Sequence, residues 1–216
     1  MRIAIMQPYF MPYAGYFRLM EGVDHFVFYD CVQFPRRGWV HRNQLTHSNG
    51  TKEWLTLPLL KTDRDSTRIM DLQFAPNAQG EWHKRLSEFP VLAKTGRLPE
   101  QVATLNGSPC DFIIEGLRTV CSMLGIHRTF SRSSDLSIPE HLKGQDRILA
   151  IAERLRATTY INAPGGRDLY DTSTFAKRGI ELVFLPDYKG PMLSMLERLL
   201  SEDASAIAHE IRANMA

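Results

Sequence analysis

Apolar residues recur along the chain with two different spacings, one typical of strands and one typical of helices. Segments of the two kinds alternate along the sequence. Short apolar runs bounded by turn residues predict strands, at 2–6, 25–29, 54–60, 69–74, 128–131, 158–162 and 180–185. Longer stretches whose apolar residues recur every three or four positions predict helices, at 15–21, 81–95, 110–124, 144–156, 171–178 and 193–212. Because strands and helices alternate, we predict the α/β class, a mostly parallel sheet flanked by helices with Rossmann-like topology. A nucleotidyltransferase-like strand order is one form of that topology.

Composition narrows the class of protein. Hydrophobic residues make up 44% and charged residues 23%, and no linker or repeat interrupts the pattern, so we expect a single domain over 1–216. The net charge of +2 argues against a nucleic-acid partner. No segment has the ~20 consecutive apolar residues of a membrane-spanning helix, and the first residues lack the apolar length of a signal peptide. We therefore expect a cytoplasmic protein.

Cysteines and histidines are spaced unlike those of disulfide frameworks or metal sites. The three cysteines, Cys31, Cys110 and Cys121, are odd in number and far apart, which favours reduced thiols. The seven histidines show no metal-ligand spacing such as His-Glu-x-x-His. We predict no metal site.

A tyrosine-rich segment at 7–16 follows the first predicted strand. Ligands of open α/β sheets bind at this end of the strands, so the segment is a candidate site. Gln7 and Tyr16 are candidate catalytic residues, and Tyr9 and Tyr13 are candidate substrate-binding residues. The alternative is that prolines shape a loop there and the tyrosines pack against the sheet.

A second candidate segment, 30–43, follows the second predicted strand and is rich in arginine. Arginine binds phosphate or carboxylate groups through two hydrogen bonds at once. Asp30 and His41 are candidate catalytic residues, and the candidates for binding an anion or substrate are Gln33, Arg36, Arg37, Trp39, Arg42 and Asn43. The alternatives are a solvated basic loop and a thiolate–imidazole pair formed by Cys31 and His41.

Two later loops each follow a predicted strand and offer weaker candidates. Ser133 and Asp135 supply a hydroxyl and a carboxylate, and Gly165 and Gly166 precede Tyr170. A glycine pair before a short helix is a weak anion-site signal, and an ordinary tight turn fits it equally well.

Several of these segments together resemble the WbqC-like protein family. The strings Ala4–Phe17 and Phe26–Phe34 carry the resemblance, followed by the Arg/Trp/Arg-Asn pattern at 36–43 and by Trp54–Pro58. Looser matches include Ser133–Leu136, Gly165 with Gly166, and Leu193–Leu196. The resemblance therefore runs through most of the chain and is most specific in its first 60 residues.

The resemblance implies a role in bacterial gene clusters for O-antigen and other surface polysaccharides. It favours a transferase that moves an acyl or aminoacyl group to an amino sugar or sugar nucleotide, with acyl-CoA, an acyl carrier or a nucleotide as the donor. Two other hypotheses stay open: a nucleotidyltransferase-like enzyme acting on a phosphate-bearing small molecule, and a non-catalytic sugar-binding or scaffolding protein of the same pathway. The substrate would be a small molecule, and an oligomer is compatible with the sequence.

Overall fold

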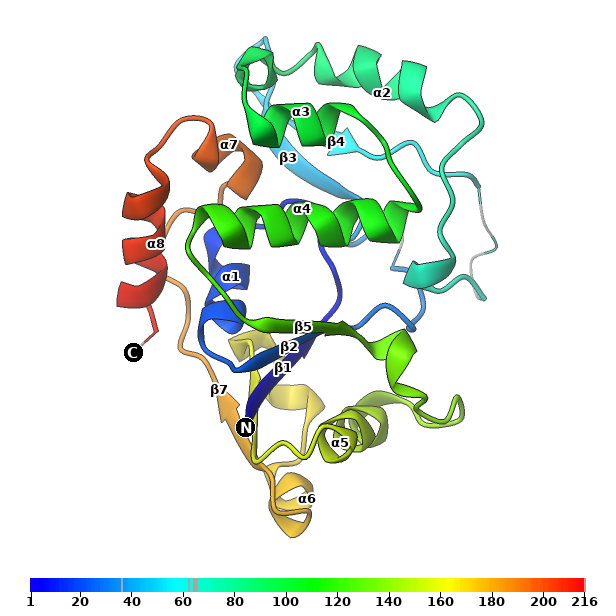
Figure 1. Cartoon of the computed structure of the whole chain (residues 1–216), viewed down its shortest axis with the longest axis vertical. Coiled ribbons are helices and arrows are strands. Elements are labelled where there is room, and N and C mark those ends of the chain that lie inside the picture. Colours follow the sequence, from blue (N-terminus) through cyan, green and yellow to red (C-terminus); the bar gives the residue numbers. More distant parts are fainter. Residues whose placement is uncertain (36, 62, 64–65, 216) are drawn as a thin grey trace.

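A computed structural model describes residues 1–35, 37–61, 63 and 66–215 (Figure 1). Its centre is a five-stranded parallel sheet in the order β5-β2-β1-β6-β7. The strands are β1 (Arg2–Met6), β2 (His25–Phe28), β5 (Thr129–Arg132), β6 (Thr159–Asn162) and β7 (Glu181–Phe184). The predicted α/β class with a mostly parallel sheet is confirmed.

Helices bury both faces of this sheet. On one face lie α1 (Ala14–Glu21), α4 (Pro109–Met123), α7 (Met195–Leu199) and α8 (Ala204–Ala213), and on the other α5 (Gly144–Arg154) and α6 (Thr172–Lys177) (Figure 1). Successive side chains of a strand point to opposite faces. Accordingly, Ala4 packs in the core with α1 and α4, whereas Ile3 and Ile5 pack in the core with α5. This two-sided burial explains why the strands read as continuous apolar runs.

A smaller layer is inserted between β2 and α4. It contains an antiparallel ribbon of β3 (Arg42–Thr46) and β4 (Lys52–Thr56), followed by α2 (Ala78–Leu86) and α3 (Arg97–Ala103). Trp82 of α2 is fully buried there, and its indole Nε1–H donates to the carbonyl of Val102 on α3 at 2.7 Å. The insertion stacks beyond α4 on the side away from the sheet (Figure 1).

Most predicted elements are confirmed, and the errors fall in the insertion and at the C-terminal end. The predicted strand 69–74 is wrong: Ile69–Asp71 forms a 3₁₀ helix, because the N–H groups of Ile69 and Met70 bond to the loop after β2. The predicted strand 54–60 starts at Lys52 and ends at Thr56. Pro58 has no N–H with which to continue a ladder.

The predicted long helices are also shorter in the structure. α2 ends at Leu86 and a separate 3₁₀ helix, Pro90–Ala93, covers part of the predicted helix 81–95, because a proline ring disfavours helical backbone before it. The predicted helix 193–212 is two helices, α7 and α8. The break comes where Asp203 accepts hydrogen bonds from the N–H groups of Ser205 and Ala206 and so starts a new helix. β3 and α3 were not predicted.

None of the helices formed by the described residues combines the length and apolar content that crossing a membrane requires.

Candidate functional site

The strand order marks one edge of the sheet as the candidate site. From β1 the chain proceeds to β2 on one side, and it later returns to β6 on the other side of β1. In open α/β sheets, small molecules bind at the carboxyl ends of strands where the order reverses in this way. Here that point lies between the loops that follow Met6 of β1 and Asn162 of β6.

The loop after β1 is held in a fixed and unusual conformation. Met11 has a φ of 45°, which is rare for a residue other than glycine. Asn43 of β3 donates from Nδ2 to the carbonyls of Phe10 (3.1 Å) and Met11 (2.5 Å), and Ser194 donates to the Met11 carbonyl at 2.8 Å. Backbone strain of this kind persists where surrounding contacts over-determine it, as at ligand sites. The predicted binding residue Asn43 is therefore buried and supports the loop.

Among the candidate residues of the loop after β1, three lie together and the fourth, Tyr13, lies elsewhere. The hydroxyl of Tyr16 donates to the carbonyl of Gln7 at 2.7 Å, and burial raises the pKa of Tyr16 well above its ordinary value. Tyr9 is half-buried against Tyr16, with ring centroids 5.5 Å apart. Tyr13 instead lies against Tyr188 after β7, also with centroids 5.5 Å apart. The structure thus keeps Gln7, Tyr9 and Tyr16 together and places Tyr13 nearer β7.

Backbone hydrogen bonds join the first loop to the arginine-rich segment. The N–H of Phe10 donates to the carbonyls of Trp39 (3.0 Å) and Val40 (3.1 Å). The two segments singled out in the sequence are therefore neighbours. Trp39 is exposed, with its ring centroid 5.0 Å from that of Trp54 on β4. Arg36 lies outside the described residues.

Arg42 organises the exposed part of this segment. Its guanidinium carbon lies 4.1 Å from the ring centroid of Trp54, which is cation–π geometry. Its Nε donates to the carbonyl of Gly38 (3.3 Å) and its Nη2 to the carbonyl of Arg37 (3.0 Å). Arg37 itself is exposed. This arrangement gives a cationic surface with two tryptophan rings in tilted contact beside the first loop.

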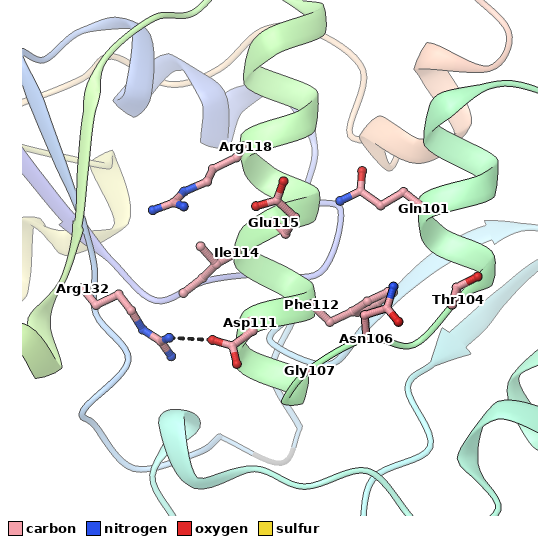
Figure 2. A pocket seen from close by; sticks show the side chains of 10 residues that line it. All are labelled: Gln101, Thr104, Asn106, Gly107, Asp111, Phe112, Ile114, Glu115, Arg118 and Arg132. Atoms are coloured by element: carbon pink, nitrogen blue, oxygen red, sulfur yellow. Dashed lines mark hydrogen bonds and ion pairs between the residues drawn. The ribbon is translucent and has the colours of Figure 1, made fainter.

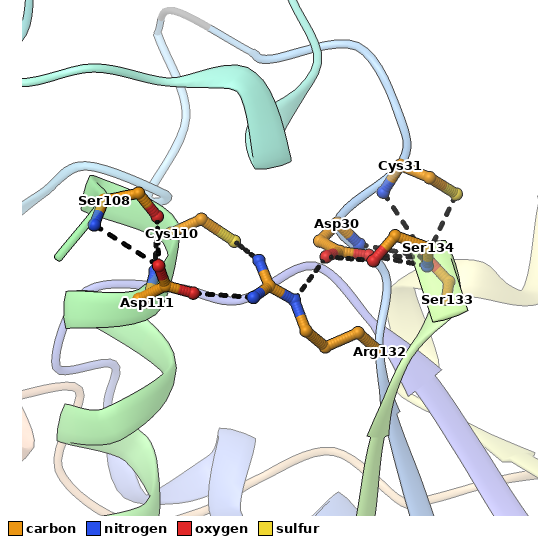
Figure 3. A network of polar contacts seen from close by, with 8 residues as sticks. All are labelled: Asp30, Cys31, Ser108, Cys110, Asp111, Arg132, Ser133 and Ser134. Carbon is orange, nitrogen blue, oxygen red and sulfur yellow. Dashed lines mark hydrogen bonds and ion pairs between the residues drawn. The ribbon is translucent and has the colours of Figure 1, made fainter. Parts of the chain in front are cut away.

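A buried carboxylate ties the ends of β2 and β5 together (Figure 3). Asp30 is fully buried, and its side-chain oxygens accept from the Ser133 hydroxyl (3.0 Å), from the Ser134 N–H and hydroxyl (3.0 and 2.8 Å), and from Nε of Arg132 (2.7 Å). Four donors on one carboxylate leave Asp30 no free capacity to take a proton from a substrate. Its observed role is to position the loops at the carboxyl edge.

Arg132 extends the same network to the start of α4 (Figure 3). It donates to Asp111 at 2.6 Å and to the thiol sulfur of Cys110 at 3.0 Å, and burial raises the pKa of Cys110 to about 12. Asp111 in turn forms a capping box with Ser108 at the start of the helix. The Ser-x-x-Asp pattern at 108–111 is the sequence signal that was available for this part of the network.

A cavity of about 360 Å³ adjoins the network between α3, α4 and β5 (Figure 2). Arg118 and Glu115 project from α4 toward it, and Gln101 reaches it from α3. The side-chain oxygen of Gln101 is buried and has no hydrogen-bond partner among the described residues. This polar cavity was not predicted, because its lining, apart from Asp111 of the capping pattern, comes from segments that carry no recognisable motif.

A protein-family model matches most of the chain, including the segments described above. The model of the WbqC-like protein family matches residues 7–194. The chain is a member of the WbqC-like protein family. The matched region opens on Gln7, the first residue of the β1 loop, and closes on Ser194, whose hydroxyl supports Met11 in that loop.

The WbqC-like chain resembles a mycobacterial protein along nearly its full length. It is 26% identical over 226 aligned residues to the uncharacterized protein Rv1507c of Mycobacterium tuberculosis, and the match covers 95% of each chain. No solved structure matches the chain.

The remaining candidates of the second segment, His41 and Gln33, line two different cavities. His41 lines a separate cavity of about 350 Å³ that also contacts Lys61 and Arg85. Burial, and secondarily the charge of Arg42, lower the pKa of His41 to about 4. Cys31 and Gln33 line another cavity, so the structure does not bring Cys31 and His41 to one pocket. Among the described residues, no group of three or more His, Cys, Asp or Glu side chains lies close enough to hold a metal ion.

The loop after β6 and the Ser133 loop complete the WbqC-like candidate set. Ser133 is buried in the Asp30 network, whereas Asp135 is exposed beyond it. Tyr170 packs edge-on against Tyr160 of β6, with centroids 5.8 Å apart. Gly165 is exposed and Gly166 is buried, both within a 3₁₀ helix over Pro164–Leu169.

The two glycines of this loop allow a matched test of its packing. A Cβ at 166 would lie 2.4 Å from Nδ2 of Asn162, whose Oδ1 accepts from the N–H of Ala163 at 2.8 Å. A Cβ at 165 would meet nothing within 4 Å. Gly166→Ala is expected to lower the free energy of unfolding by about 1 kcal/mol through overpacking. Gly165→Ala should change it by less than about 0.5 kcal/mol, and equal urea midpoints for the two variants would contradict this account.

Proposed function

We propose that this WbqC-like protein is a transferase of bacterial surface-polysaccharide (O-antigen) biosynthesis. It moves an acyl or aminoacyl group from an activated, negatively charged donor to an amino sugar or sugar nucleotide. The observation that carries the proposal is the reversal of strand order between β1 and β6, which sets Gln7 and the loop after it opposite the loop after Asn162. The family resemblance supplies the pathway and the class of acceptor.

The chemistry of acyl transfer fits the groups at this edge. An amine that attacks an acyl carbonyl generates a negatively charged oxygen, which hydrogen-bond donors stabilise. The side-chain amide of Gln7 has no partner among the described residues and is half-buried at the reversal, so it is our candidate donor to that oxygen. Tyr9, half-buried against Tyr16 in the same loop, is an aromatic residue of the kind on which sugar rings stack. The Arg42–Trp54 surface supplies positive charge for a phosphate-bearing donor.

Nucleotidyl transfer is the second candidate, and the strand order favours it. The order β5-β2-β1-β6-β7 follows the 3-2-1-4-5 portion of the doubly wound arrangement, which holds nucleotides at the reversal. Such an enzyme would bind a nucleoside triphosphate at the same edge and act on a phosphate-bearing small molecule.

Ligand-dependent thermal stability separates the two candidates. A ligand that binds the folded protein raises its melting temperature by mass action. Acyl transfer predicts stabilisation by acyl-CoA together with an amino-sugar nucleotide, followed by release of free coenzyme A when both are present. Nucleotidyl transfer predicts stabilisation by ATP or CTP and release of pyrophosphate. A sugar nucleotide that stabilises the protein without turnover would instead identify a binding protein and overturn both.

Arg42→Ala tests the placement of the donor. Loss of the guanidinium removes positive charge beside the β1 loop, so we expect the dissociation constant of the stabilising ligand to rise about tenfold. Arg178→Ala is the matched control, because Arg178 follows α6 at the opposite edge of the sheet and pairs with Glu153 at 2.7 Å. Equal ligand affinities for the two variants would show that Arg42 only supports residues 37 and 38.

A further inference from the structure

Arg147, in the first turns of α5, is a buried cation without a carboxylate partner. Only 9% of the residue is exposed, and no ion pair joins it to any described residue. Its Nη1 donates to the carbonyls of Pro139 (3.1 Å) and Leu142 (3.3 Å), and its Nη2 donates to the sulfur of Cys31 (3.1 Å). Its Nε is buried with no hydrogen-bond partner among the described residues.

Three arginines are buried among the described residues, and Arg18 and Arg147 lack a carboxylate partner whereas Arg198 has two. Arg198, which is 3% exposed, is neutralised by Glu202 and Glu210 at 2.6 and 2.7 Å. Buried charges are normally paired in this way, because removal from water is costly for an isolated ion. The groups that accept from Arg147 are two carbonyls and the Cys31 sulfur, and none is a carboxylate. A carboxylate partner is therefore missing from its described surroundings.

A cavity of about 360 Å³ lies directly against Arg147. Tyr29 and Cys31 line it from the end of β2, and Lys143 and Gly144 line it from the start of α5. Burial raises the pKa of Tyr29, so its hydroxyl stays protonated and able to donate a hydrogen bond. The volume is in the range of small-molecule sites.

The charge around this cavity is positive. Arg68 also lines it, but Asp71 (2.7 Å) and Glu140 (3.4 Å) neutralise that side chain. Lys143 and Arg147 lack ion-pair partners among the described residues, and Glu140 is the single carboxylate among the described residues of the lining.

The N-terminus of α5 adds to the positive potential at this cavity. Lys143, its N-cap residue, provides no side-chain cap, so the first N–H groups of the helix are left for another acceptor. Asp146 offsets part of the helix dipole, but it is exposed and does not line the cavity.

We propose that this cavity is a binding site for the phosphate group of a small molecule, with Arg147 as its buried counter-ion. The oxyanion would accept from the first N–H groups of α5 and from Lys143, and the buried guanidinium of Arg147, which lines the cavity, would supply positive charge. A tetrahedral oxyanion suits this set, because its oxygens accept several donors from different directions. The site stands whether or not the protein is a transferase.

Calorimetric titration of the full chain with inorganic pyrophosphate, at constant ionic strength, tests the site. The wild type is expected to bind one equivalent. Arg147→Gln should raise the dissociation constant at least about tenfold, because it removes the buried positive charge that lines the cavity. Arg154→Gln, at the exposed end of the same helix, is the matched control and should bind as the wild type does. Absence of binding to the wild type, or equal binding by Arg147→Gln, would overturn the proposal.

A second variant keeps the test decisive if Arg147→Gln does not fold. Lys143 is exposed at the rim of the cavity, so Lys143→Glu inverts a charge there without disturbing the core. It is expected to abolish pyrophosphate binding with an unchanged circular dichroism spectrum, and retained binding would count against the site. Because neither titration involves turnover, failure here leaves the transferase proposal to its own test.

Discussion

Replacement of Asp30 by alanine is expected to lower the free energy of unfolding by about 3–5 kcal/mol, the range seen when one partner of a buried ion pair is removed. The carboxylate is fully buried and accepts from Arg132, Ser133 and Ser134. Its loss would leave the Arg132 guanidinium half satisfied and the Ser134 N–H without an acceptor. Urea unfolding, followed by tryptophan fluorescence, measures the change.

Asp111, the second carboxylate that pairs with Arg132, provides the control. Asp111 also pairs with Arg132, at 2.6 Å, but about half of its side chain is exposed to solvent. Exposed ion pairs contribute little, so Asp111→Asn should cost about 1 kcal/mol or less. If the two variants were equally stable, Asp30 would not be the organising group of the carboxyl edge. Its candidacy as a direct proton acceptor would then reopen.

The fold was predictable because the parallel strands carry their burial pattern locally. β1 and β2 are buried on both faces and read as apolar runs, and the helices between them show apolar spacing of three and four. The elements of the insertion between β2 and α4 were harder to predict from the sequence. β3 begins at Arg42 and carries Asn43 and Gln44, so its polar composition concealed a strand. The 3₁₀ helix at Ile69–Asp71 is fixed by hydrogen bonds to the loop after β2, which local sequence does not encode.

The candidate site was predictable in position but not in its contacts. Polar residues after β1, β2, β5 and β6 were expected to meet because parallel strands share a carboxyl edge. Which side chains pair depends on partners about a hundred positions away, as with Asp30 and Arg132. Arg147 was missed for the same reason, since on the sequence it is one charged residue in an amphipathic helix. Its lack of a counter-ion is visible only once the surrounding side chains are in place.

Acidification from pH 7 to pH 5 is expected to destabilise the protein by about 1–2 kcal/mol through His41. Burial lowers the pKa of His41 to about 4, against about 6.5 in an unfolded chain. The unfolded state therefore binds the proton more readily, so this stabilisation is complete above about pH 6.5 and is lost as the pH falls toward 4. The full shift would correspond to about 2 kcal/mol at pH 5, and partial exposure of the ring reduces it. Unfolding in urea at both pH values measures the loss.

His41→Gln should flatten much of this pH dependence, because glutamine carries no proton to exchange. Burial also lowers the pKa of His25, which acts in the same direction, so a residual slope is expected in the variant. His209→Gln replaces an exposed histidine on α8 and should keep the wild-type slope. A His41→Gln slope equal to that of the wild type would mean that the ring is protonated without penalty in the folded protein. His41 would then carry its charge at neutral to mildly acidic pH in a cavity that also holds Lys61 and Arg85, and the cavity would gain a third cation in place of a neutral base.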